Sequence, residues 1–259
     1  MAKQGFTLLE LSIVLVIIGL LIGGIFVGQS LIHTAQLNAV ISEFNRYQTA
    51  VQNFKQQYQA LPGDMPNAGQ FWGYVNATPA TCRITASTTT ATCDGNGDGT
   101  LNDNGTSSLE HFRFWQHLAN AKMIEGQYTG IGTFTATSGT TAGVNVPASK
   151  YPNGAWGLAP SASLGGSGST FATDYGTGHV LETGAQESNA HIWPAGALYN
   201  GKDAWSIDKK FDDGKPGLGN VLVYGWAACT NAATNADLTA TYTLTVTSAS
   251  CSLIFLTGF

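Results

Sequence analysis

The segment from Phe6 to Gly28 limits what this chain can fold into. Apart from Thr7, Ser12 and Glu10, it contains only apolar residues and glycine. Its length is close to the roughly 20 residues that a helix needs to cross a bilayer. An acidic residue in the middle of such a helix costs about 2.5 to 3.5 kcal/mol on insertion scales, and intramembrane ionisable residues are usually functional. The segment therefore predicts a membrane-spanning helix in which Glu10 has a specific partner.

A retained helix explains this segment better than a secretory signal peptide does. The apolar core of a signal peptide spans about 7 to 15 residues and ends at a small-x-small cleavage site. Here the apolar run is longer, and no such site precedes the polar residues after Gly28. Lys3 lies on the short N-terminal side, which favours an N-terminus in the cytoplasm and the remaining chain outside it.

The N-terminus resembles the processing motif of a known protein family. Residues 3–10 are KQGFTLLE, and the apolar run follows them. This pattern is similar to the prepilin motif of type IV pilins and type II secretion pseudopilins. The resemblance implies that a prepilin peptidase in the inner membrane cuts after Gly5 and that Phe6 becomes the N-methylated first residue.

The same resemblance implies a partner for Glu10. In the family, this glutamate neutralises the terminal amine of a neighbouring subunit during assembly. Such a pair is physically reasonable because a buried charge becomes tolerable when it is paired. The alternative is a glutamate that only reaches the membrane interface near the end of the helix.

The helical pattern continues beyond the membrane segment. Apolar residues recur at spacings of three and four, and no proline interrupts residues 6–60. The sequence LPGD at 61–64 is a stop signal, so we predict one helix of about 55 residues. Residues 1–5 are then the leader, 6–28 the membrane half, 29–60 an amphipathic half, and 61–259 a globular head. The predicted stripe that packs on the head is Val40, Phe44, Tyr47, Val51, Phe54 and Tyr58.

The head is expected to be α+β. Residues 109–126 predict a short helix, residues 130–139 a strand, and residues 221–224 a buried strand. Residues 239–247 alternate threonine with larger apolar residues, which predicts a strand with one exposed face, and residues 252–259 predict the last strand. We expect an antiparallel sheet at the C-terminal end. A long helix laid against such a sheet is also the type IV pilin fold that the resemblance implies.

Four cysteines predict disulfides in a head outside the cytoplasm. They allow three pairings, and buried free thiols are the alternative. We favour Cys82 with Cys93 and Cys229 with Cys251, because each pair encloses a segment rich in Thr, Ala and Asn that has little else to hold it. The sequence contains no C-x-x-C motif, so it does not indicate a zinc or redox site.

The segment DGNGDGTLNDNG predicts a Ca²⁺ site. It matches the first half of an EF-hand loop, in which oxygen ligands alternate and glycine makes the sharp turn. Gly105 stands where the closing glutamate would be, so the last ligand must be Asp103 or Glu110. The alternatives are an Asx-rich turn and a Glu110 that caps the following helix with Ser107. The candidate ligands are Asp94, Asn96, Asp98, Thr100 through its carbonyl, Asn102, Asp103 and Glu110.

A second acidic segment, IDKKFDDGKPG, contains Asp208, Asp212 and Asp213. It resembles a segment of large proteobacterial prepilin-type proteins, and so does LPGDMPNA at 61–68. The sequence leaves open whether these carboxylates form a second metal site or an exposed acidic turn.

Charge and motifs favour a structural role. The formal net charge is −5 and only 10% of residues are charged, without a Lys/Arg cluster for specific nucleic-acid binding. No catalytic motif occurs, so we expect no enzyme activity.

We expect a subunit that waits in the inner membrane and is then polymerised by pilus or secretion machinery through its N-terminal helix. The product would be an extracellular homopolymer, a type IV pilus-like filament on the cell surface that supports adhesion or motility. The alternative is a minor pilin or pseudopilin of a type II secretion or DNA-uptake machine, which a head of about 200 residues keeps open.

Overall fold

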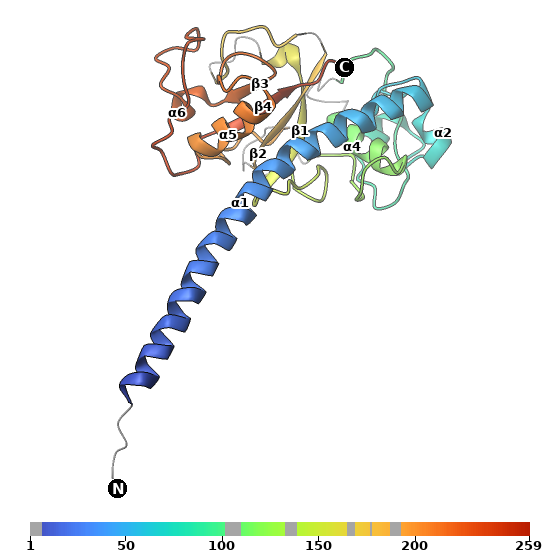
Figure 1. Cartoon of the computed structure of the whole chain (residues 1–259). Coiled ribbons are helices and arrows are strands. Elements are labelled where there is room, and N and C mark those ends of the chain that lie inside the picture. The colour runs from blue at the N-terminus through green and yellow to red at the C-terminus, as the bar shows by residue number, and fades with distance from the viewer. Residues whose placement is uncertain (1–6, 102–109, 133–138, 165–168, 177, 187–192) are drawn as a thin grey trace.

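The first helix carries the whole architecture. The computed structural model of the 259-residue chain describes residues 7–101, 110–132, 139–164, 169–176, 178–186 and 193–259. Helix α1 spans Leu8–Tyr58 without a break and ends at Gln59, which adopts a left-handed conformation with φ of 53°. Its first half projects from the head, and its second half lies across the head (Figure 1). The predicted single long helix is confirmed.

The sheet has four antiparallel strands in the order β1-β2-β4-β3. The strands are β1 (Gly154–Pro160), β2 (His179–Ala185), β3 (Val221–Tyr224) and β4 (Ser252–Leu256). The last two were predicted from the sequence, and both are confirmed. The fold is therefore α+β, with a long N-terminal helix packed against a C-terminal antiparallel sheet, as in the pilin fold.

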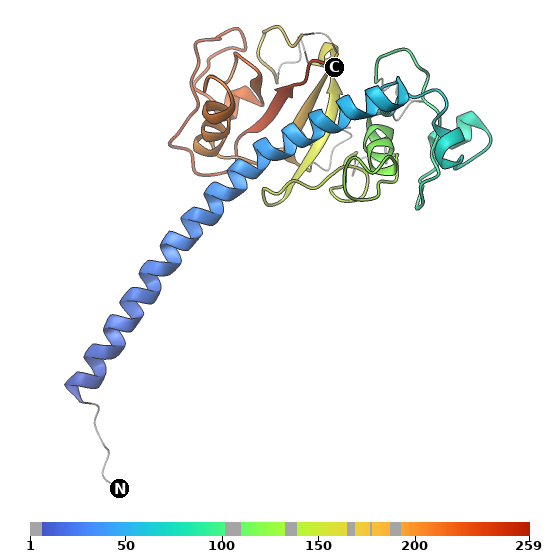
Figure 2. The same cartoon turned by 45° about the vertical axis from the view of Figure 1, so that its right-hand side comes forward.

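Short helices complete the head. Helix α4 (Glu110–Asn120) confirms the second predicted helix. Helices α2 (Ala68–Trp72) and α3 (Pro79–Arg83) lie with it beside the C-terminal part of α1 (Figure 2). Helices α5 (Gly201–Phe211) and α6 (Trp226–Cys229) lie at the other end of the head (Figure 2). A 3-10 turn, Ser161–Ser163, follows β1.

An aromatic stripe on α1 forms the centre of the core. Phe44 stacks on Phe255 of β4, with ring centroids 4.8 Å apart. Tyr47 contacts Trp115 of α4 at 5.0 Å and Trp156 of β1 at 5.5 Å. Such pairs add about 0.5 to 1.5 kcal/mol each beyond the area that they bury. One face of α1 thus joins the sheet to α4, and the predicted stripe is buried except for Tyr58, which is half-buried.

The turn after α1 requires glycine at position 63. Gly63 has φ of +88°, and a Cβ there would lie 2.5 Å from the carbonyl oxygen of Glu110. Its N–H donates to Nδ1 of His117 on α4 at 2.9 Å. The LPGD stop signal therefore also brings the end of α1 against α4.

Two strand predictions differ from the structure. Residues 239–247 form no strand, because Tyr242 turns inward to donate to Asp208 on α5 at 2.7 Å, while Leu244 stays half exposed. Only an isolated bridge joins Tyr242 to Thr230. Of the strand predicted at 130–139, residues 133–138 lie outside the described residues, and residues 130–132 form no strand.

Glu182 is buried on the sheet face opposite α1. It lies on β2 between Gly157 and Ile254 of the neighbouring strands, on the same face as the apolar cluster of Val180 and Leu222. Neither carboxylate oxygen has a hydrogen-bond partner among the described residues. Burial raises the pKa of Glu182 to about 8, so the protonated form is favoured in the folded state.

Glu182 should make the head less stable as pH rises. The folded state holds this proton up to about pH 8, whereas the unfolded chain releases it near the ordinary value of about 4.3. Between these values the folded state binds more protons, so its free energy of unfolding falls with rising pH. We expect a fall of up to about 4 kcal/mol from pH 5 to pH 8, at about 1.4 kcal/mol per unit, and Glu182→Gln should remove it.

Denaturant unfolding of the full chain in detergent at both pH values measures this effect. Glu125→Gln is the matched control, because Glu125 is exposed on the head. Asp208 also has a raised pKa, about 7, but it titrates in the parent and the variant alike. Parallel pH profiles for the parent and Glu182→Gln would contradict the prediction.

Candidate functional site: the exposed helix and its attachment to the head

The first half of α1 is an apolar surface without a partner in the isolated subunit. From Leu8 to Ile32 its large apolar side chains are between 45% and 90% exposed. Among the described residues, α1 is the one helix long and apolar enough to cross a membrane. An apolar surface of this size marks a protein or membrane interaction site.

Glu10 caps its own helix in the isolated subunit. Its carboxylate accepts from the N–H and the hydroxyl of Thr7, both at 2.9 Å, and its N–H donates to the Thr7 hydroxyl at 3.2 Å. This capping box satisfies backbone donors at the start of α1. The carboxylate stays exposed, so it can also meet another subunit. Gly5 and Phe6, the predicted processing residues, lie outside the described residues.

Glu43 fixes the second half of α1 to the head. Its side chain is 4% exposed and accepts from the backbone N–H of Lys150 at 3.0 Å, the Ser149 hydroxyl at 3.0 Å and Nε1–H of Trp156 at 2.9 Å. These donors come from β1 and the segment before it. A buried carboxylate that is so fully hydrogen-bonded holds the helix at one register on the sheet.

Asp203 forms a second attachment, where α1 leaves the head. Oδ1 of Asp203 on α5 lies 2.8 Å from Nε2 of His33, and Oδ2 accepts from the Tyr151 hydroxyl at 3.0 Å. Asp203 is 6% exposed and His33 is 48% exposed. Among the described residues of α1 that precede His33, none is buried.

Sequence reasoning missed both attachments, although Glu43 gave a signal. It lies three residues after Val40 and one before Phe44, within the stripe predicted to be buried. A charged residue at such a position needs a partner. No sequence pattern indicated Asp203, because its partners His33 and Tyr151 are far away in the chain.

Two disulfides stabilise the head. Cys82 pairs with Cys93 and Cys229 pairs with Cys251, the local pairings that the sequence favoured. The first closes the Thr-rich segment after α3, and the second ties α6 to the residue before β4. A disulfide that closes a loop of this size stabilises the folded state by about 3 kcal/mol, because it lowers the conformational entropy of the unfolded chain.

The predicted calcium ligands that the structure describes have hydrogen-bond partners within the protein. Asp94 is turned toward the Gly69 N–H at 2.8 Å and the Tyr74 hydroxyl at 3.0 Å. Asp98 accepts from the Thr100 N–H at 2.8 Å, and Asn96 donates to Asp98 through its amide at 2.8 Å.

Other acidic groups surround the same loop. Glu110 accepts from the Asn96 N–H at 3.3 Å, and Asn102 and Asp103 lie outside the described residues. Asp64, which the sequence did not indicate, accepts from the N–H groups of Gly97 at 2.6 Å and Gly99 at 2.8 Å.

The second acidic segment is brought together. The carboxylates of Asp208, Asp212 and Asp213 lie within 4.8 Å of one another. Asp208 is buried on α5 rather than in an exposed turn, and it accepts from the Tyr242 hydroxyl and the Gly214 N–H. Asp212 accepts from the Val221 N–H and Asp213 from the Lys215 N–H. These bonds connect α5 to β3 and to residue 242.

The exposed apolar half of α1 continues into a half that packs on an antiparallel sheet, as in the pilin fold. The comparison with protein families agrees. Residues 1–26 match the model of the prokaryotic N-terminal methylation motif. This match confirms the resemblance to type IV pilins and pseudopilins at the N-terminus, and it points to a structural protein processed by a prepilin peptidase and anchored in a membrane before assembly. None of the curated proteins and none of the solved structures compared with the chain matched it.

Glu43→Ala should destabilise the head strongly. The substitution leaves Trp156 Nε1–H, the Lys150 N–H and the Ser149 hydroxyl without their buried acceptor, and we expect a loss of about 3 kcal/mol or more. Denaturant unfolding of the full chain in detergent gives the difference. Gln52→Ala, at an exposed position of α1, is the control and should change stability by less than about 0.5 kcal/mol. Equal stability of the two variants would show that Glu43 does not fix the helix.

Proposed function

We propose that this protein is the structural subunit of an extracellular type IV pilus-like filament. The leader is cut after Gly5, Phe6 is methylated, and the subunit waits in the inner membrane before it polymerises through α1 and supports adhesion or motility. The observation that carries the proposal is the exposed apolar half of α1, most of which lies within the segment that matches the methylation motif.

Physical reasons favour a helical polymer over a permanent anchor. A large apolar side chain left in water costs about 1.5 to 3 kcal/mol, so this half-helix needs either lipid or neighbouring helices. Lipid tails are as apolar as leucine, so hydrophobicity alone does not drive the helices from the membrane into a polymer. A pair between Glu10 and a neighbour's terminal amine supplies the missing energy, because each charge is costly in lipid when unpaired.

The glycines of α1 support close packing between subunits. Gly19, Gly23, Gly24 and Gly28 form two G-x-x-x-G patterns, which let helices approach closely. A Cβ at any of these positions would meet nothing within 4 Å in the isolated subunit. Glycine is therefore not required there by the fold of the subunit itself.

A second candidate function keeps the same N-terminus. A head of about 200 residues also suits a minor pilin or pseudopilin of a type II secretion or DNA-uptake machine. The two are distinguished by abundance: a main subunit dominates sheared filaments, whereas a minor subunit is present in few copies.

Glu10→Gln should fold and insert into the membrane but form few filaments. Removing the charge eases insertion and deletes the pair with the terminal amine. Thr7→Ala is the matched control, because it breaks the capping box and keeps the carboxylate, so it should still assemble. Electron microscopy counts the filaments that each variant forms. Mass spectrometry of parent filaments should identify this chain, with methylated Phe6 as its first residue. Parent-like filament numbers from Glu10→Gln would refute the pairing, and filaments lost equally in Thr7→Ala would assign Glu10 to capping alone.

We also propose that the loop from Asp94 to Glu110 binds Ca²⁺. The support is its D-x-N-x-D-G spacing and the proximity of Asp98 to the buried Asp64. Burial is the main cause that raises the pKa of Asp64, and the charge of Asp98 adds to it. A divalent cation would relieve this repulsion. Asp98 and Glu110 are the ligands that this arrangement favours, whereas Asp94 already accepts hydrogen bonds from Gly69 and Tyr74.

Calcium should raise the melting temperature of the full chain in detergent relative to a chelator. Ligand binding to the folded state alone contributes about 2.7 kcal/mol at 100 times the dissociation constant. Asp98→Asn should remove the calcium dependence, and Asp237→Asn, at another acidic turn, should keep it. Identical melting with calcium and chelator in the parent would show that the loop is only a turn.

A further inference from the structure

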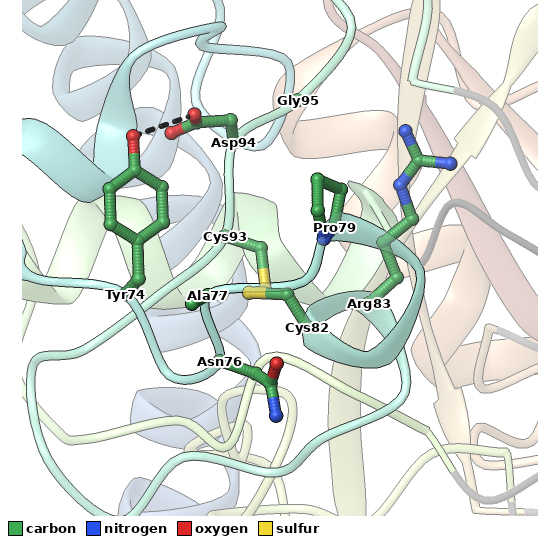
Figure 3. Close-up of a pocket in the computed structure, with 9 residues that line it drawn as sticks. All are labelled: Tyr74, Asn76, Ala77, Pro79, Cys82, Arg83, Cys93, Asp94 and Gly95. Carbon is green, nitrogen blue, oxygen red and sulfur yellow. Dashed lines mark hydrogen bonds between the residues drawn. A yellow bond between two sulfur atoms is a disulfide. The ribbon is translucent and has the colours of Figure 1, made fainter.

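A pocket lies on the part of the head farthest along α1 from the N-terminus. It has a volume of about 230 Å³ and is formed by the segment after α2, by α3 and by the residues after Cys93 (Figure 3). Ligand pockets for drug-sized molecules usually have roughly 300 to 1,000 Å³. This pocket therefore suits a smaller ligand, of the size of one sugar ring.

One side of the pocket is an acceptor held in a fixed orientation. The Tyr74 hydroxyl donates to Oδ2 of Asp94 at 3.0 Å, and the Gly69 N–H donates to Oδ1 at 2.8 Å. Each carboxylate oxygen keeps a further lone pair. The Tyr74 side chain is 49% exposed, so its ring also offers an apolar face at the pocket.

The other side of the pocket carries donors. Arg83, the last residue of α3, lies across the pocket from Asp94 and Tyr74, with Pro79 between Asp94 and Arg83 (Figure 3). Within the described part of the chain, no hydrogen bond or salt bridge is recorded for the Arg83 guanidinium. Asn76 also lines the pocket, and its side-chain oxygen accepts from the Thr78 N–H.

The walls of the pocket are held by covalent and backbone constraints. The Cys82–Cys93 disulfide forms part of the wall, and Cys82 and Cys93 are buried. A backbone bridge joins Tyr74 to Thr92, next to Cys93. The acceptor and the ring are therefore positioned before any ligand binds, which lowers the entropic cost of binding.

We propose that this pocket binds an acidic sugar residue, such as a hexuronate. The guanidinium of Arg83 would bind the sugar carboxylate in the two-bond arrangement typical of such pairs. Asp94 would accept from a sugar hydroxyl, and the Tyr74 ring would cover the apolar face of the sugar. A phosphate group fits less well because it carries about −1.5 to −2 charges at pH 7, so Asp94 repels it more strongly than a singly charged carboxylate. A zwitterionic amino acid leaves the Tyr74 ring unused.

Binding of D-glucuronate and D-galacturonate to the full chain in detergent tests the proposal. Saturation-transfer NMR titrations should show uronate binding in the millimolar range, with D-glucose weaker and glycine absent. Arg83→Gln should weaken uronate binding at least tenfold. Lys202→Gln removes the same charge at an exposed position of α5 and should leave binding unchanged.

The outcomes separate this site from filament assembly, because the titration uses the unpolymerised chain. Thermal melting that is the same for Arg83→Gln and the parent establishes that the variant is folded. Tyr74→Ala should weaken glucuronate and glucose alike, as expected for a stacking surface. Uronate binding that Arg83→Gln does not change, glycine binding as strong as that of uronate, or no uronate signal would each overturn the proposal.

Discussion

The first half of α1 is unfavourable in water, and this constraint determines which surroundings the subunit needs. From Leu8 to Ile32 the helix presents its apolar side chains on every face, so no single surface of its own head could cover them. The segment must be surrounded, either by lipid or by other helices. The head accordingly buries α1 only from Val40 onward. The first half stays free to be surrounded by lipid or by other helices.

The second half of α1 has the opposite task, and its interactions are correspondingly specific. Phe44, Tyr47 and Phe54 supply the apolar contact, but apolar contact alone would permit the helix to slide by a turn. Glu43 prevents this because its buried carboxylate accepts only from donors at one position, next to β1. His33 and Asp203 then mark where the packed half ends.

Much of this organisation could be predicted from the sequence, because it depends on local patterns. Residue spacing gave α1, α4 and the buried stripe, and short apolar runs gave β3 and β4. The local disulfides followed from the composition of the segments that they enclose. What the sequence did not reveal depends on contacts between distant segments.

Strands β1 and β2 are the clearest example. Gly157 and Gly184 interrupt their patterns, and both glycines are there because Pro194 lies against them: an added Cβ would come within 2.3 Å and 2.0 Å of it. A contact between distant segments also explains why Tyr242 is not in the predicted strand, since it donates to Asp208, which is buried on α5. Asp94 belongs to a calcium-binding pattern along the chain, and that pattern does not indicate its hydrogen bonds with Gly69 and Tyr74.

In the proposed filament, one half of α1 forms the interior while the other half holds the head unchanged. Electron cryomicroscopy of filaments sheared from cells that express this chain measures both parts at once. We predict a map in which residues 8–32 of adjacent subunits pack together at the filament axis, with the head arranged on residues 40–58 as in the isolated subunit. Filaments whose axis is built by another chain, or in which residues 8–32 of this chain lie on the outer surface, would contradict it.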